Sequence, residues 1–255
     1  MVLLNSCLRS DKQIFSVTGE VMYDEFKQNH FMLDGHEGAV IFPQGAKNNK
    51  PYIWRAEFPG AFDSVDRELL RRGWHLVYYR ISDLFGCPSA IEKMHNFQTY
   101  IEDNFGLSRK AVIFGFSRGG LYAVNYAAAY PGKVAKLYLD APVLDVFSWP
   151  GGLFRGIGSR SDWEICRKLY GIGEGVKNFP QNPINNISVL IKHKIPVILV
   201  AGDADEVVPL NENGKLLYAD YMLAGAPIKF IIKPGIGHHP HSLDDPKEIA
   251  DWIEA

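Results

Sequence analysis

The sequence predicts an α/β domain in which a mostly parallel central sheet is covered by helices on both faces. Short apolar runs that are typical of buried strands alternate along the chain with segments of helical periodicity. The composition, with 47% hydrophobic and 22% charged residues, provides ample apolar surface for a core. The length of 255 residues fits one domain of this class with a small insertion, so we expect a single domain over residues 1–255.

The strand predictions depend on apolar, β-branched and aromatic runs that are bounded by turn residues. The first run, QIFSVTGEVMY at residues 13–23, alternates enough to indicate an edge strand or a hairpin. The later runs are shorter or more apolar, and several are expected to be buried; they lie at residues 38–43, 52–58, 74–81, 110–116, 136–143, 195–202 and 227–234.

Helices are expected between these strands, where apolar residues recur at helical spacing. FDSVDRELLRRG stops at Gly73, which is a favourable C-terminal cap, and a longer helix follows Pro88 and ends at Gly106. Further helices are expected at residues 119–132, 211–225 and 244–255.

The periodicity fades between about residues 145 and 189, where glycine and aromatic residues are frequent and one short helical patch occurs. This pattern predicts an insertion that forms a cap or lid over the functional site. Its aromatic residues either pack against the core or line a pocket. We predict that Trp149 contacts the substrate, because the surrounding segment SWPGG is too rich in glycine for ordinary core. The other aromatic residues of the insertion are Phe147, Phe154 and Trp163.

Charge and cysteine content argue against several functional classes. The formal net charge is −2 and no block of like charges occurs, so the sequence offers no basic surface for nucleic acid or an anionic membrane. No apolar run approaches the roughly 18 residues that a membrane span needs. Cys7, Cys87 and Cys166 are odd in number and far apart, so we expect free thiols rather than a disulfide framework or a metal knuckle.

The first residues, MVLLNSCLRS, lack the long apolar region and the basic head of a secretory signal. The default expectation is therefore a cytoplasmic location, although a signal that had been removed would leave no trace. The sequence does not indicate an oligomeric state.

A candidate nucleophile lies in the sequence Gly115-Phe116-Ser117-Arg118-Gly119, a G-x-S-x-G motif between a predicted strand and a predicted helix. A serine in such a sharp turn adopts an unfavourable backbone conformation, and glycines two positions away relieve the crowding. The helix N-terminus offers N–H groups to developing negative charge. The alternative interpretation is a glycine-rich turn without chemistry.

A serine hydroxyl needs a base, and the base needs an acid to orient it. Three acidic residues follow the strand at 195–202, and we favour Asp205, with Asp203 as a brace of the turn. Asp140, at the end of another strand, is the second candidate for the acid.

Histidines that could act as the base follow the strand at 227–234, in KPGIGHHPHSL. His238 is favoured over His239 because it is the first histidine reached after an uncrowded glycine turn. A metal site formed with His241 is disfavoured, because adjacent histidines separated from a third by proline are not expected to converge on one ion.

The three segments GFSRGG, GDADEVVP and PGIGHHPHSL, in this order, resemble those of the α/β-hydrolase superfamily over roughly residues 38–255. The resemblance implies Ser117 as nucleophile, Asp205 as acid and His238 as base, with no metal or organic cofactor. The segment RAEFPG at residues 55–60 stands where this superfamily usually has a His-Gly loop that forms part of the oxyanion hole. The implied oxyanion donors are the N–H of Arg118 and one near Ala56 or Glu57.

The arginine after the serine is similar to that of esterases acting on plant polysaccharides, and the wider pattern is similar to uncharacterised hydrolases of polysaccharide-degrading bacteria. The resemblance implies a serine esterase for small-molecule or saccharide esters with acetyl, feruloyl or uronate methyl groups. Arg55 and Arg118 either bind a carboxylate or sugar hydroxyls, or brace the site through Glu57. The alternatives are a peptidase of the prolyl-oligopeptidase type, which usually has a further large domain, and a non-catalytic binding protein with this fold.

Overall fold

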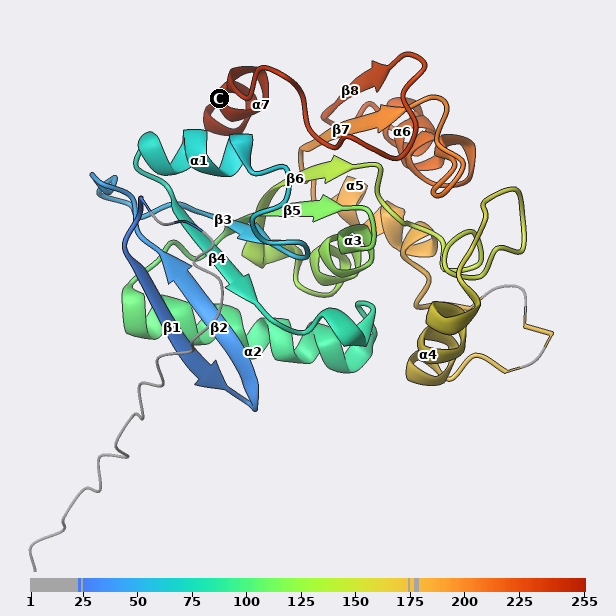
Figure 1. Ribbon diagram of the computed structural model, residues 1–255, viewed down its shortest axis with the longest axis horizontal. Helices are drawn as coiled ribbons and strands as arrows, with labels where there is room; N and C mark the ends of the chain where they lie inside the picture. Colours follow the sequence, from blue (N-terminus) through green and yellow to red (C-terminus); the bar gives the residue numbers. More distant parts are fainter. Residues whose placement is uncertain (1–22, 24, 174, 177–178) are drawn as a thin grey trace, which may run out of the picture.

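The computed structural model describes residues 23, 25–173, 175–176 and 179–255 of the chain (Figure 1). Its centre is an eight-stranded sheet in the order β1-β2-β4-β3-β5-β6-β7-β8. The pairs β1–β2 and β2–β4 are antiparallel and all later pairs are parallel. The strands are β1 Gln28–Leu33, β2 His36–Ile41, β3 Tyr52–Arg55, β4 His75–Tyr79, β5 Ala111–Phe116, β6 Val134–Asp140, β7 Val197–Gly202 and β8 Ile228–Lys233.

The helices lie on both faces of this sheet, as the sequence predicts (Figure 1). The α-helices are α1 Ser64–Arg71, α2 Pro88–Phe105, α3 Gly119–Ala129, α4 Arg160–Tyr170, α5 Ile187–Lys192, α6 Gly214–Leu223 and α7 Lys247–Glu254. Short 3-10 helices are η1 Ser82–Leu84, η2 Pro131–Lys133, η3 Pro183–Asn186 and η4 Leu210–Glu212.

Two apolar layers hold the helices to the sheet. The layer under α1 and α7 contains Leu69 and Ile253 together with the strand residues Ile53 and Phe114. The opposite layer packs α2, α3, α5 and α6 against the other side of the same strands. Every residue of β3, β4, β5 and β7 is buried, which explains why these strands appear in the sequence as nearly continuous apolar runs.

The N-terminal edge differs from the sequence-based expectation. The edge strand expected at residues 13–23 lies outside the described residues except for Tyr23. The observed edge strand is β1, which the sequence does not indicate because QNHFML mixes polar and apolar residues without clean alternation. It forms an antiparallel hairpin with β2, closed at Asp34 and Gly35.

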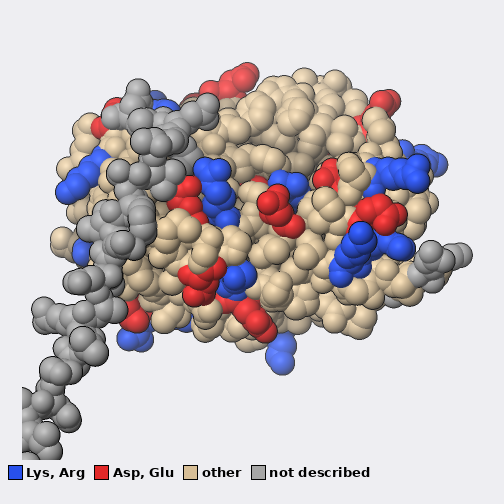
Figure 2. Space-filling view, turned by 60° about the horizontal axis from the view of Figure 1, so that its bottom comes forward, with Lys and Arg blue, Asp and Glu red and all other residues tan. Residues whose placement is uncertain are grey.

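The structure also shows where the charged residues and the cysteines lie. On the face drawn in Figure 2, Lys and Arg lie interspersed with Asp and Glu rather than in a patch of one sign. Cys87 and Cys166 are buried free thiols, whereas Cys7 lies outside the described residues. None of the helices in the described ranges is long and apolar enough to cross a membrane.

Candidate active site

The carboxyl ends of the parallel strands carry the polar residues of the candidate site, as expected for a sheet of this type. Ser117 occupies the turn between β5 and α3 with a φ of +47°, a conformation that L-residues rarely adopt. A Cβ on Gly115 would lie 2.9 Å from the Cβ of Ala123, and one on Gly119 would lie 3.3 Å from the Cβ of Glu57. The two glycines therefore provide the clearance that the strained turn requires.

The structure brings Ser117, His238 and Asp205 together in one chain of hydrogen bonds. His238 Nε2 lies 2.9 Å from Ser117 Oγ, and His238 Nδ1 lies 2.7 Å from Asp205 Oδ2. The Asp205 side chain is 1% exposed and that of His238 is 8% exposed. Asp205 Oδ1 also accepts hydrogen bonds from the backbone N–H groups of Val207 and Val208, which fix the carboxylate beside the imidazole.

The other candidates for the acid and the base are placed differently. Asp203 accepts a hydrogen bond from the backbone N–H of Gly235 and so braces the turn. Asp140 pairs with His241 rather than with His238, through a contact of 2.8 Å between Oδ1 and Nδ1. The Asp140–His241 pair is buried, with side-chain exposures of 0% and 3%. His239 is exposed and stacks on the ring of Phe62.

Two backbone N–H groups beside Ser117 are available as oxyanion donors. Among the described residues, neither the N–H of Arg118 nor that of Glu57 has a hydrogen-bond partner. The structure contradicts the suggestion of Ala56 as a donor, because its N–H already bonds to the carbonyl of Phe114 at 3.1 Å. This bond extends the pairing of β3 with β5 by one residue, so the free N–H groups begin at Glu57.

Glu57 and Arg118 also contact each other through their side chains. Arg118 Nε lies 3.5 Å from Glu57 Oε1, and the Glu57 side chain is 1% exposed. Burial raises the pKa of the Glu57 carboxyl, although the charge of Arg118 acts in the opposite direction. The Arg118 guanidinium lies 5.0 Å from the ring centroid of Phe85, so it is held between an acid and an aromatic ring. This position matches the bracing role that the sequence left open for Arg118.

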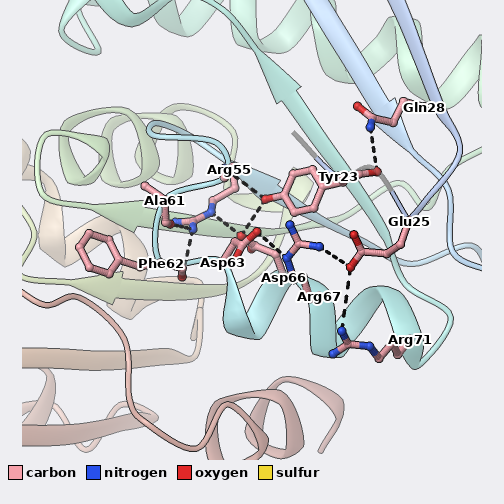
Figure 3. Close-up of polar contacts among 11 residues, drawn as sticks. Tyr23, Glu25, Gln28, Arg55, Ala61, Phe62, Asp63, Asp66, Arg67 and Arg71 are labelled. Atoms are coloured by element: carbon pink, nitrogen blue, oxygen red, sulfur yellow. Dashed lines mark hydrogen bonds and ion pairs between the residues drawn. The ribbon is translucent and has the colours of Figure 1, made fainter. Parts of the chain in front are cut away.

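Arg55 does not contact Glu57 or reach the surface, and its predicted role in substrate binding is wrong. Its side chain is 1% exposed and its Nε pairs with Asp66 Oδ2 at 2.8 Å. Figure 3 shows the guanidinium directed at the carbonyls of Ala61 and Phe62. Tyr23 donates to the same Asp66 oxygen. Because a buried guanidinium needs a buried partner, Arg55 braces the loop after β3.

A small cavity of about 180 Å³ opens at Ser117. Its walls are the side chains of the loop after β3, the end of β5 and the histidine loop: Phe58, Ala61, Phe62, Phe116, Ser117, His238, His239 and His241. Trp149 is not among the described residues that line this cavity. It packs on Phe85 instead, with ring centroids 6.2 Å apart. A larger hollow of about 840 Å³ is lined by Asp205 but by neither Ser117 nor His238.

The three histidines after β8 lie closer together than the proline between them led us to expect. Each of His238, His239 and His241 has a ring nitrogen within 4.8 Å of the others. The loop folds back on itself because Lys233 Nζ donates hydrogen bonds to the carbonyls of Pro240 and Ser242. This turn returns His241 to the same side as His238.

Sequence reasoning missed the walls of the cavity and the second Asp–His pair. Phe58 and Phe62 lie in a loop and have positive φ values of 53° and 50°. No sequence motif predicts this conformation. The sequence made Asp140 the second candidate for the acid and placed His241 only in a disfavoured metal site, and nothing in it indicated that the two pair with each other. A position at the end of a parallel strand was the available signal.

The chain resembles known proteins both in part of its sequence and in its fold. A sequence model described as the alpha/beta hydrolase fold matches residues 81–155. No curated protein matches the sequence at a significant level. Among solved structures, a puromycin-hydrolyzing peptidase from Mycobacterium tuberculosis is similar, with a TM-score of 0.69 and 15% identity over 94% of this chain and 39% of its own.

Two further structures have the same arrangement. Acylaminoacyl peptidase from Pyrococcus horikoshii has a TM-score of 0.64 and 17% identity, covering 84% of this chain and 38% of its own. S-formylglutathione hydrolase from Staphylococcus aureus has a TM-score of 0.64 and 15% identity, covering 90% of this chain and 95% of its own. The chain thus spans about two fifths of the two peptidases and nearly all of the formylglutathione hydrolase. The chain has the α/β-hydrolase fold.

Proposed function

We propose that the protein is a serine hydrolase that cleaves carboxylic esters through an acyl-enzyme intermediate. The observation that carries this proposal is the hydrogen-bonded chain from Ser117 Oγ through His238 to Asp205, with distances of 2.9 and 2.7 Å. A serine activated in this way is the nucleophile that acyl transfer requires.

In the proposed reaction Ser117 Oγ attacks the ester carbonyl carbon while His238 Nε2 takes the hydroxyl proton. The oxyanion of the tetrahedral intermediate accepts hydrogen bonds from the free N–H groups of Arg118 and Glu57, each worth about 3 kcal/mol of transition-state stabilisation. The leaving alcohol takes its proton from His238. Water then attacks the acyl-enzyme with His238 as base, which restores Ser117 and releases the acid.

The cavity supports a short acyl group as the preferred substrate. Its volume of about 180 Å³ is smaller than the roughly 300–1,000 Å³ of pockets that enclose drug-sized ligands. Phe58, Phe62 and Phe116 make its walls largely apolar, which suits a methyl group better than a charged one. Of the saccharide esters considered, acetyl esters therefore fit the proposal better than feruloyl esters.

The proposal is tested by substituting the serine. Ser117→Ala is expected to abolish the hydrolysis of p-nitrophenyl acetate, because no other hydroxyl occupies the strained turn. Ser161→Ala, at an exposed position on α4, is the matched control and should keep wild-type activity. Circular dichroism and thermal melting establish that both variants fold. Full activity in a folded Ser117→Ala protein would refute the proposed mechanism.

Peptide hydrolysis is a second candidate, favoured by the fold similarity to two peptidases. Both reactions would use the same serine and oxyanion donors. Comparing p-nitrophenyl acetate and acetylated xylan with aminoacyl and prolyl p-nitroanilides separates the two. Labelling of Ser117 by a fluorophosphonate probe separates both from a non-catalytic binding protein, which would not react.

A further inference from the structure

The three histidines after β8 surround a common point. The ring centroids of His238, His239 and His241 lie 4.8, 5.0 and 4.9 Å apart, with interplanar angles of 67°, 81° and 86°. The three rings therefore form a nearly equilateral triangle in which each is steeply inclined to the other two. One ring nitrogen of each lies within 4.8 Å of the others.

This triangle has the dimensions of a three-histidine metal site. In a tetrahedral site with Zn–N bonds of about 2.0–2.1 Å, the centroids of two coordinated imidazoles lie roughly 5 Å apart. The observed centroid distances agree with this value, so the rings need to turn rather than to move apart. The nitrogens themselves would have to close to about 3.4 Å, which follows from the same bond length and tetrahedral angle.

Two of the three histidines already have the outer partners that metal-binding histidines use. His238 Nδ1 contacts Asp205 and His241 Nδ1 contacts Asp140, at 2.7 and 2.8 Å. A carboxylate on Nδ1 holds the proton there and leaves the Nε2 lone pair free for a metal. The two buried carboxylates also place negative charge behind the rings, which favours a cation between them.

His239 supplies the third ligand. Its side chain is exposed and stacks on Phe62, so it can turn without disturbing the core.

We propose that His238, His239 and His241 bind one divalent transition-metal ion, such as Zn²⁺, and that the bound ion inhibits the enzyme. The ion takes the Nε2 lone pair of His238, which otherwise accepts the proton of Ser117, and leaves its fourth position to water. The inhibition rests on the proposed function, whereas the binding does not.

Equilibrium dialysis of the full chain against Zn²⁺ tests the binding without any assay of activity. Wild type is expected to bind one ion at this site, and His239→Gln to weaken that binding at least tenfold. His193→Gln, which removes an exposed histidine after α5, is the matched control and should bind as wild type does. Mg²⁺ should not compete, because it prefers oxygen ligands.

Equal Zn²⁺ affinity in wild type and His239→Gln, or loss of binding in His193→Gln alone, would overturn the proposed site. With p-nitrophenyl acetate, Zn²⁺ should inhibit wild type over the concentration range in which it binds, and EDTA should restore the rate. Unchanged activity at a Zn²⁺ concentration that saturates the site would overturn the inhibitory role. A wild-type protein without esterase activity would instead contradict the proposed function and leave the dialysis result to decide the site.

Discussion

At the scale of single residues, two buried Asp–His pairs lie beside Ser117, and only the Asp205–His238 pair hydrogen-bonds to the Ser117 hydroxyl. Asp205→Asn is expected to lower kcat by roughly 10³–10⁴-fold, because His238 loses the partner that orients it and stabilises its charge. Asp140→Asn removes the partner of His241, so it should lower stability by about 1–3 kcal/mol while changing kcat less than about tenfold. Ester hydrolysis by the two purified variants measures both effects. An equal loss of kcat in the two would show that the acids share the role.

The individual site residues were predictable where a motif and a strand end coincide. Ser117, Asp205 and His238 each follow an apolar strand, so their meeting at one edge of the sheet follows from the topology. Whether the N–H of Ala56 is free depends on how far β3 pairs with β5, and that is a contact between segments distant in the sequence. The same holds for Arg55, whose partner Asp66 lies on the next helix.

At the scale of elements, the loop between β3 and α1 is held by a buried ion pair. Asp66→Ala would leave the Arg55 guanidinium buried without its partner, so we expect a loss of about 3–5 kcal/mol in the free energy of unfolding. Tyr23→Phe removes one hydrogen bond to the same carboxylate and should lose about 1 kcal/mol. Urea denaturation of the two variants checks this order. A smaller loss in Asp66→Ala than in Tyr23→Phe would contradict the bracing role of the pair.

Most elements were predictable because periodicity is a local property. The expected helix that follows Pro88 and ends at Gly106 is α2, at Pro88–Phe105, and the buried strands agree to within a few residues. The insertion at residues 145–189 contains α4 and ends within the first turn of α5, and its function as a cap stays a prediction. Trp149 packs on Phe85 rather than entering the cavity. Tertiary contacts determine this position, and the local composition does not predict it.

At the scale of the whole molecule, the C-terminal helix is tied to residues far back in the sequence. Glu254 on α7 accepts hydrogen bonds from Trp74 Nε1 at 2.9 Å and from Arg72 at 3.1 Å, and it also pairs with Lys47. Burial alone would raise the pKa of this carboxyl, but the hydrogen bonds outweigh burial and lower the pKa from its ordinary value of 4.5. The ionised form therefore stabilises the folded state.

This lowered pKa gives a pH dependence of definite sign. A carboxyl with a lower pKa in the folded state stabilises the fold above its unfolded pKa, and the contribution is lost as pH falls through the folded pKa. Glu254→Gln should therefore be about 1 kcal/mol less stable than wild type at pH 7, with a difference that shrinks as pH falls below 4.5. Glu248→Gln on the same helix is the control. Its carboxylate is 49% exposed and pairs with Lys229, so its loss should be a few tenths of a kcal/mol. Urea unfolding across this pH range measures the stability of both variants. If the loss of stability in Glu254→Gln grew on acidification, the helix would be held by other contacts.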